Sequence, residues 1–448
     1  MTNALNIPPA IPSLGQAFRY WFHLGLISFG GPAGQIAIMH TDLVEKKRWI
    51  SEQRFLHALN YCMVLPGPEA IQLAIYISWL MHGVLGAVMA GILFFLPAFF
   101  LLSALAGIYL AWGDLPWIQG IFYGIKPAVV AIVLFAAWRI GSKVLNNTWL
   151  WSIATLAFMA VFFFKISFPW VVLVAIILGV LGGKLYPEKF KANYAHNTVR
   201  KSYGAAVIDD HSPTPIHAQF SWRKFMLTLI IFLAIWVVAL LVVGGQSTLQ
   251  QMGLFFTKAA FLTIGGAYAV LPYVYQGGVE HYAWLTGAQM MDGLALGEAT
   301  PGPLIMVVTW IGYIGGVTKE VVVNPVLAGV MGALVATFFT FLPSFFFIIA
   351  GGPIVESTRG DLKFTAPLTA ITAAVVGVIV NLALFFAWHT FWPHATEQAP
   401  FAGSFDYWAV LLAMVSFLAL WRYKVDVTKV IAVSALVGLV FALLKTGG

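Results

Sequence analysis

Two copies of the same pair of helix-breaking motifs constrain the fold of this chain more than any other feature. A glycine pair at 30–31 and a Pro-Gly-Pro triplet at 66–68 recur as a glycine pair at 265–266 and a triplet at 301–303. One ungapped offset relates both motifs. A second offset, longer by an insertion near Thr318–Ala328, aligns Leu96-Pro97 with Leu342-Pro343. Features that stay in register over so much of a chain indicate an internal duplication.

Composition indicates that the chain lies in a lipid bilayer. Hydrophobic residues make up 60% of the sequence and charged residues only 9%, whereas about a quarter of a soluble domain is charged. Each repeat contains apolar segments of the length that membrane-spanning helices need. We expect helices at 14–39, 55–82, 83–112, 117–140, 148–164, 168–185, 225–246, 248–275, 288–316, 325–352, 364–390, 405–421 and 429–445. The predicted fold class is an all-α polytopic membrane protein.

Several function classes find no support in the sequence. The net charge of +7 comes mainly from basic residues in short loops, so it predicts membrane orientation rather than nucleic-acid binding. Metalloprotease, Walker and serine-hydrolase motifs are absent, so we expect a transporter without cofactor or metal rather than an enzyme. The single cysteine, Cys62, rules out a disulfide within the chain.

The duplication predicts three parts of the chain. The first repeat covers residues 1–185, a polar linker and one extra helix cover 186–246, and the second repeat covers 247–448. One extra crossing between two repeats of six segments inserts the second repeat upside down, as in many secondary transporters. The excess of lysine and arginine predicts a cytoplasmic N-terminus, a cytoplasmic linker and an external C-terminus.

The motifs leave two readings of the broken segments open. Segments 14–39 and 55–82 either cross the membrane as kinked spans or turn back at their motifs as re-entrant hairpins. Hairpins return the basic loop 41–54 to the cytoplasm and improve the charge balance, so we favour them.

Breaks inside the membrane predict an anion site. Backbone groups freed by a break must face protein or a water-filled cavity, and a helix that restarts at a proline directs free N–H groups and its positive dipole end towards the break. Breaks that serve only packing are the alternative reading. The predicted substrate-binding positions in the motifs are Gly30, Gly31, Pro66, Gly67, Pro68, Gly265, Gly266, Pro301, Gly302 and Pro303.

Ionisable residues in the apolar segments complete the predicted site, because such residues are costly in lipid. We expect Arg19, His23, Lys126 and Lys258 to bind substrate, although Arg19 also suits a position at the membrane interface. We expect His57, Glu69, Asp292 and Glu298 to couple protons. The repeat pairs His23 with Lys258 and His57 with Asp292. Cations beside helix N-termini suit a tetrahedral dianion.

The motifs resemble those of a known family. The stretches "FHLGLISFGGPAGQIAIMHTDLVEKKRWISEQRF" and "LPGPEAIQLAIYISW", repeated as "FFTKAAFLTIGGAYAVLPYV" and "ATPGPLIMVVTWIGY", resemble the chromate ion transporter (CHR) family in its long, two-domain form. The resemblance covers nearly all of both halves. It implies a carrier of the plasma (inner) membrane that exports chromate with the proton motive force and confers chromate resistance. Ala267 replaces Pro32 and Leu304 replaces Glu69 in the second half, so the halves have specialised.

The substrate and assembly stay open at this point. Chromate and sulfate are similar dianions, so transport or exchange of sulfate or another small anion is the alternative. The oligomeric state is also open, with a homodimer as one candidate.

Overall fold

The structure is a computed structural model of the chain. It describes residues 8–29, 31–190, 203–209, 212–245, 247–264, 267–357, 365–393, 395, 399 and 401–446. Three predicted site residues, Gly30, Gly265 and Gly266, lie outside the described residues. The described residues form helices and no strand, so the all-α prediction is confirmed.

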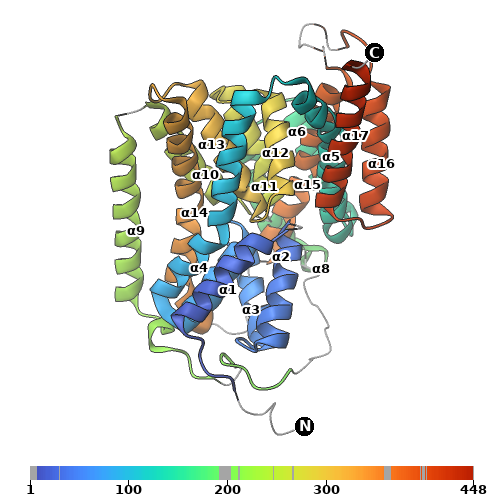
Figure 1. Ribbon diagram of the computed structural model, residues 1–448. Coiled ribbons are helices and arrows are strands. Elements are labelled where there is room, and N and C mark those ends of the chain that lie inside the picture. Colours follow the sequence, from blue (N-terminus) through green and yellow to red (C-terminus); the bar gives the residue numbers. More distant parts are fainter. Residues whose placement is uncertain are drawn as a thin grey trace.

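The first repeat begins with short helices and continues with long ones (Figure 1). In chain order these elements are α1 (Leu14–Ile27), α2 (Gly31–Met39), the π-helix η1 (His40–Lys46), α3 (Glu52–Val64), α4 (Glu69–Trp112), α5 (Pro116–Val144), α6 (Thr148–Phe162) and α7 (Phe168–Leu185). Between the repeats lie α8 (Pro187–Phe190), the 3-10 helix η2 (Ile216–Ala218) and α9 (Trp222–Val243).

The second repeat has the same order of elements. It consists of α10 (Ser247–Leu262), α11 (Ala267–Tyr275), the π-helix η3 (Gln276–His281), α12 (Gly287–Ala299), the 3-10 helix η4 (Leu304–Met306), α13 (Val307–Thr318), α14 (Pro325–Ser357), α15 (Thr365–Phe391), α16 (Tyr407–Trp421) and α17 (Val427–Thr446). Equivalent residues start equivalent helices. The Ser51 hydroxyl caps α3 and the Thr286 hydroxyl caps α12, each accepting a backbone N–H three residues later.

α4 is a hairpin of two helical arms. Its backbone leaves the helical region at His82 and at Gly83, which has a φ of +61°. A Cβ on Gly86 would meet His82 and Ser78, and a Cβ on Gly91 would meet Ile75, so the second arm folds back along the first. In the second repeat the loop 319–324 takes the place of this tight turn, in the region where the insertion is expected.

The broken segments of the first repeat turn back at their motifs. The loop after η1 pairs with the linker: Val207 N–H donates to Arg48 C=O, and Ser51 N–H donates to Ile208 C=O. The turn of α4 also meets the linker, since His217 Nε2 lies 2.8 Å from Trp79 C=O. We call this side of the molecule, which carries residues 203–209 and 212–221, the linker face. In the structure these segments are therefore re-entrant hairpins rather than kinked spans.

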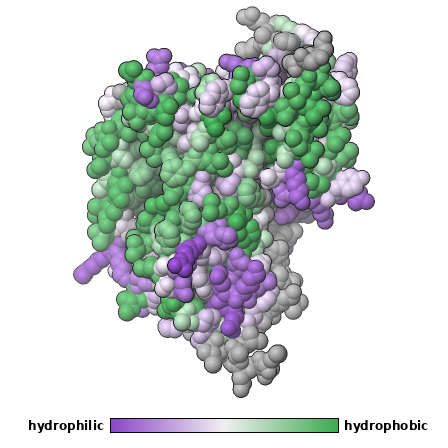
Figure 2. Space-filling view, in the orientation of Figure 1, coloured by the Kyte–Doolittle hydropathy of each residue, from purple (hydrophilic) through white to green (hydrophobic). Residues whose placement is uncertain are grey.

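The second repeat runs in the opposite direction. α9 leaves the linker and ends at the opposite face, where α10 begins, and α17 also ends at that face (Figure 1). Within the described residues, seven helices are long and apolar enough to cross a membrane. On the face shown in Figure 2, hydrophobic residues cover most of the helices, and hydrophilic residues gather around α1 and α3. The chain is therefore a multi-pass membrane protein.

Small residues set the distance between the long helices. A Cβ on Gly124 of α5 would collide with the backbone of α17 at Ser434 and Gly438, and one on Gly377 of α15 would collide with α6 at Ala154. Such contacts are typical of membrane helices, where close backbone approach replaces hydrophobic burial as the source of stability. The long helices α5, α6, α15 and α17 are therefore closely packed against one another.

Candidate functional site

The breaks of the two repeats cross each other and exchange backbone hydrogen bonds. Gly67 N–H, in the first triplet, donates to the Thr263 carbonyl just before the second glycine pair at 2.7 Å. Gly302 N–H, in the second triplet, donates to the Ser28 carbonyl just before the first glycine pair at 2.9 Å. These four residues are pseudo-symmetric equivalents. The breaks therefore meet in one layer of the molecule, where each satisfies backbone groups of the other repeat.

Three glycines in this layer have backbone conformations that other residues rarely adopt. The φ angles are +67° at Gly31, +123° at Gly67 and +119° at Gly302. A Cβ on Gly67 would lie 2.7 Å from Ser344 Oγ, and one on Gly302 would lie 2.6 Å from Ala98 Cβ. A Cβ on Gly31 would meet no atom within 4 Å. The triplets are packed against the long helices, whereas the space beside Gly31 is open.

The helices after the two triplets start differently. Glu69 begins α4 directly after Pro66–Pro68, and no side chain caps this N-terminus. After Pro301–Pro303 the chain first forms the single 3-10 turn η4, and α13 begins only at Val307. The first break therefore presents the N–H groups of a long α-helix, which is the arrangement that binds anions.

Buried polar side chains that the sequence analysis missed surround the crossed breaks. Gln35 Nε2 donates to the Gly302 carbonyl at 2.6 Å, and Gln72 Nε2 donates to the Pro66 carbonyl at 2.6 Å. Gln35 and Gln72 are fully buried and Ser344 is 1% exposed, yet Gln35 Oε1, Gln72 Oε1 and Ser344 Oγ have no hydrogen-bond partner. Their counterparts in the other repeat are Val270, Val307 and Ala98. A comparison of the two repeats for positions that are polar in one and apolar in the other would therefore identify these three residues.

Two predicted proton-coupling acids lie around one arginine. The charge of Arg139 on α5 acts on both Glu69 and Glu298, which belong to α4 and α12. The Tyr268 hydroxyl, on α11, donates a hydrogen bond to Glu298. None of the ion pairs in the described part of the chain includes Arg139. Sequence reasoning gave Arg139 no role in the site, because this residue lies near the end of the apolar segment 117–140.

Asp292 and Lys126, which were predicted for different roles, form an ion pair near the opposite face. Lys126 Nζ lies 3.8 Å from Asp292 Oδ1, and the Tyr109 hydroxyl donates to Asp292 Oδ2 at 3.0 Å. The side chain of Asp292 is 2% exposed and that of Lys126 is 30% exposed. The pair links the broken α12 of the second repeat to α4 and α5 of the first repeat.

A second, tighter ion pair lies on the linker side and was not predicted. Arg54 of α3 donates to Glu356 of α14 at 2.8 Å, and the Tyr76 hydroxyl donates to the same carboxylate at 2.5 Å. The side chains of Arg54 and Glu356 are 6% and 1% exposed. This pair links the broken helices of the first repeat to the second repeat. It is therefore the approximate pseudo-two-fold counterpart of the contact made by Asp292.

The structure does not bring all the predicted residues into this layer. Arg19 and His23 lie on the exposed side of α1, and Lys258 lies on the exposed side of α10. His57 is half-buried on α3. A helical segment with apolar residues all round gives no signal of which side faces protein. The substrate-binding and proton-coupling roles of these four residues stay predictions.

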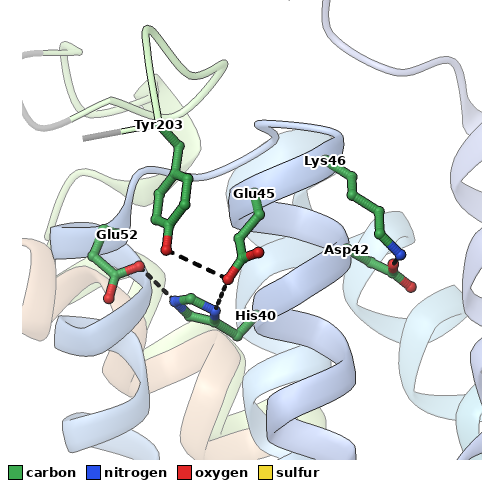
Figure 3. A network of polar contacts seen from close by, with 6 residues as sticks. All are labelled: His40, Asp42, Glu45, Lys46, Glu52 and Tyr203. Carbon is green, nitrogen blue, oxygen red and sulfur yellow. Dashed lines mark hydrogen bonds and ion pairs between the residues drawn. The ribbon is translucent and has the colours of Figure 1, made fainter. Parts of the chain in front are cut away.

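A polar network on the linker face holds the first hairpin (Figure 3). His40 lies between two carboxylates, with Nε2 2.5 Å from Glu52 and Nδ1 3.3 Å from Glu45, and the Tyr203 hydroxyl of the linker donates to Glu45 at 3.4 Å. Partial burial and the two carboxylates raise the pKa of the Tyr203 phenol. Lys46 pairs with Asp42 beside it. The network joins η1, α3 and the linker, away from the crossed breaks.

The chemistry of the break layer suits a small anion and a proton. It offers a free helix N-terminus and buried hydrogen-bonding side chains. It also contains one arginine near two carboxyl groups that can carry protons. The described residues contain no group of three histidine, cysteine, aspartate or glutamate residues that could hold a metal ion.

Comparison with known proteins identifies the family. The family model "Chromate transporter" matches residues 15–180 and 250–439. The chain is 30% identical over 430 residues to the chromate transport protein of Cupriavidus metallidurans, covering 96% of this chain and 93% of the relative. It is 31% identical over 440 residues to the chromate transport protein of Pseudomonas aeruginosa, with coverage of 96% and 93%.

A cyanobacterial relative is more distant. The probable chromate transport protein of Synechococcus elongatus is 26% identical over 442 residues, with coverage of 98% of both chains. No solved structure matches the chain. The matches to the relatives span both repeats and the linker, and the family model matches each repeat in turn. This chain, with its two inverted sets of broken helices, belongs to the chromate transporter family.

Proposed function

We propose that this protein transports chromate across the membrane and binds the oxyanion where the breaks of the two repeats cross. The observation that carries the proposal is the crosswise pairing of Gly67 with Thr263 and of Gly302 with Ser28. This pairing brings each triplet beside the residues that precede the glycine pair of the other repeat. The relatives named as chromate transport proteins support chromate as the substrate.

We further propose that transport is coupled to protons through Glu69. This residue begins α4 at the first break, where an ionised carboxylate would repel an oxyanion. A proton on Glu69 removes that repulsion, so binding of the proton and binding of the oxyanion favour each other. Arg139, whose charge acts on Glu69 and Glu298, balances the charge of whichever carboxyl is ionised.

The direction of transport in this proposal is export driven by the proton motive force. In a bacterial cell this places the protein in the plasma membrane, with the linker face in the cytoplasm. Lys47 and Arg48, after η1, and Arg223 and Lys224, at the start of α9, lie on that face, which agrees with the positive-inside rule. The membrane potential, which is negative inside the cell, drives a dianion outward even when one proton leaves with it. Such export would confer chromate resistance.

The test is uptake of radiolabelled chromate by everted membrane vesicles with an imposed pH gradient. We expect uptake that rises with the gradient, and excess sulfate in a parallel sample measures how well the site separates the two dianions. Glu69→Gln should remove the dependence on the gradient while chromate–chromate exchange remains. Asp114→Asn, a carboxylate on an exposed loop of the opposite face, is the matched control.

The outcomes separate the parts of the proposal. Vesicles that accumulate sulfate but no chromate would overturn the substrate. Chromate uptake that ignores the gradient in the wild type would overturn proton coupling. Loss of exchange in Glu69→Gln, with the gradient response intact in the remaining flux, would make Glu69 a structural partner of Arg139.

A further inference from the structure

The two crossed breaks are equivalent by symmetry but differ in chemistry. Around the first triplet, Pro66–Pro68, lie Gln72 on α4 and Ser344 on α14. The counterparts around the second triplet, Pro301–Pro303, are Val307 and Ala98. The two long helices approach their triplets in the same way, because a Cβ on Gly67 would meet Ser344 and a Cβ on Gly302 would meet Ala98. One break is therefore polar where the other is apolar.

The polar break has hydrogen-bonding capacity that the protein leaves unused. Gln72 is fully buried and Ser344 is 1% exposed, and neither Gln72 Oε1 nor Ser344 Oγ has a partner. An unsatisfied buried polar atom costs free energy, and such atoms usually mark a bound water, ion or ligand. The Ser344 hydroxyl can donate to an oxyanion, whereas Gln72 Oε1 is an acceptor that only a donor such as water satisfies. Gln72 uses one Nε2 hydrogen for the Pro66 carbonyl, so its second hydrogen and the Ser344 hydroxyl hydrogen remain available to an acceptor.

The uncapped N-terminus of α4 lies at the same break. Pro68 precedes α4 without a side-chain cap, whereas the apolar break is followed by the 3-10 turn η4. Glu69 also belongs to this break, and its counterpart in the second repeat is Leu304. Helix N–H groups, an amide, a hydroxyl and a protonatable acid thus share one break, and the other break has none of the last three at the equivalent positions.

We propose that the oxyanion binds on one side of the pseudo-symmetry axis, at Pro66–Pro68, where Gln72 and Ser344 donate hydrogen bonds to it beside the α4 N-terminus. The second break is apolar, packs on Ala98 and takes no part in recognition of the oxyanion. This inference rests on the proposed function, since it locates the substrate of that transport. Gln35, the other buried amide beside the breaks, holds the second break in place by donating to the Gly302 carbonyl.

The chain supplies its own test substitutions. Gln72→Val and Ser344→Ala give the first break the residues of the second break, and neither adds volume to the core. Ala98→Ser and Val307→Thr are matched controls of equal burial at the apolar break. Equilibrium dialysis of purified protein in detergent with radiolabelled chromate measures the dissociation constant directly, without needing transport.

We expect each of the two test substitutions to raise the dissociation constant about 10-fold to 100-fold, which is typical of losing one hydrogen bond to a charged group. The controls should stay within about twofold of the wild type. Size-exclusion profiles identify folded samples, and Ser344→Ala alone suffices if Gln72→Val does not fold.

The result separates this inference from the proposed function. If the wild type binds no chromate, the proposed function fails. If the wild type binds chromate and both test variants bind it equally well, the unpaired atoms hold water only and this inference alone is overturned. Equal weakening by Ala98→Ser would also overturn it, because the site would then involve both breaks.

Discussion

The buried ion pair between Arg54 and Glu356 gives a quantitative test of how the first hairpin is held on the second repeat. The perturbation is a double-mutant cycle of Arg54→Met, Glu356→Gln and the two together. Glutamine keeps an oxygen that can accept the Tyr76 hydroxyl, so Glu356→Gln removes the charge but not that hydrogen bond. The cycle therefore isolates the ion pair.

The magnitude follows from the burial of both partners. The side chains of Arg54 and Glu356 are 6% and 1% exposed, with their charged atoms 2.8 Å apart. Removing one partner leaves the other as an uncompensated buried charge, which costs about 3–5 kcal/mol. Removing both charges leaves no such charge, so the double variant should be more stable than either single variant.

The assay is thermal unfolding of detergent-solubilised protein at one fixed scan rate. At about 2 °C for each kcal/mol, the single variants should lose roughly 6–10 °C and the double variant clearly less. Additive losses in the double variant would refute the reasoning, since independent sites add and a paired site does not. Single variants that unfold within about 2 °C of the wild type would show that the pair is hydrated rather than buried.

Three further predictions test other parts of the structure. In a cysteine-free background, Lys47→Cys and Gln219→Cys should label from one side of the membrane with an impermeant maleimide and Asp114→Cys from the other. If Lys47→Cys is labelled from the same side as Asp114→Cys, the first segment is not a re-entrant hairpin. Gly31→Ala should cost about 1–2 kcal/mol of unfolding free energy through its positive φ without a steric clash; an unchanged melting temperature would contradict this backbone conformation. Lys126→Met should lower the melting temperature less than half as much as Arg54→Met, because an ammonium that is 30% exposed and 3.8 Å away compensates the buried Asp292 carboxylate only weakly; an equal loss would contradict that geometry.

Sequence reasoning predicted the parts of the fold that depend on local pattern. The lengths of the apolar segments located the helices, and the charges of loop 41–54 favoured the hairpins. Both features depend on how single segments interact with lipid and water, so they can be recognised without knowledge of tertiary contacts. The same reasoning could not predict that the breaks of the two repeats pair crosswise. Which carbonyl accepts the Gly67 N–H depends on how two repeats far apart in sequence pack together.

The candidate site was predictable only in part, for a physical reason. The costly charges Glu69, Asp292, Glu298 and Lys126 stand out in apolar segments, and the structure places them inside the helix bundle. Uncharged polar residues such as Gln72 are tolerated in many membrane helices, so their presence in an apolar segment is weak evidence for a site. Charges near segment ends are ambiguous as well, because a long side chain there can reach the interface or turn inward.

The crosswise hydrogen bonds between the breaks also bear on how such a protein can be assembled from pieces. The Gly67 N–H of the first repeat donates to the Thr263 carbonyl of the second, and the Gly302 N–H of the second repeat donates to the Ser28 carbonyl of the first. A lone repeat would leave these groups unsatisfied in an apolar interior, at a cost of several kcal/mol each. A half-length chain can therefore complete its fold only beside another half inserted in the opposite orientation. If this chain were cut in the linker, its halves should be stable when made together and should be degraded when made alone.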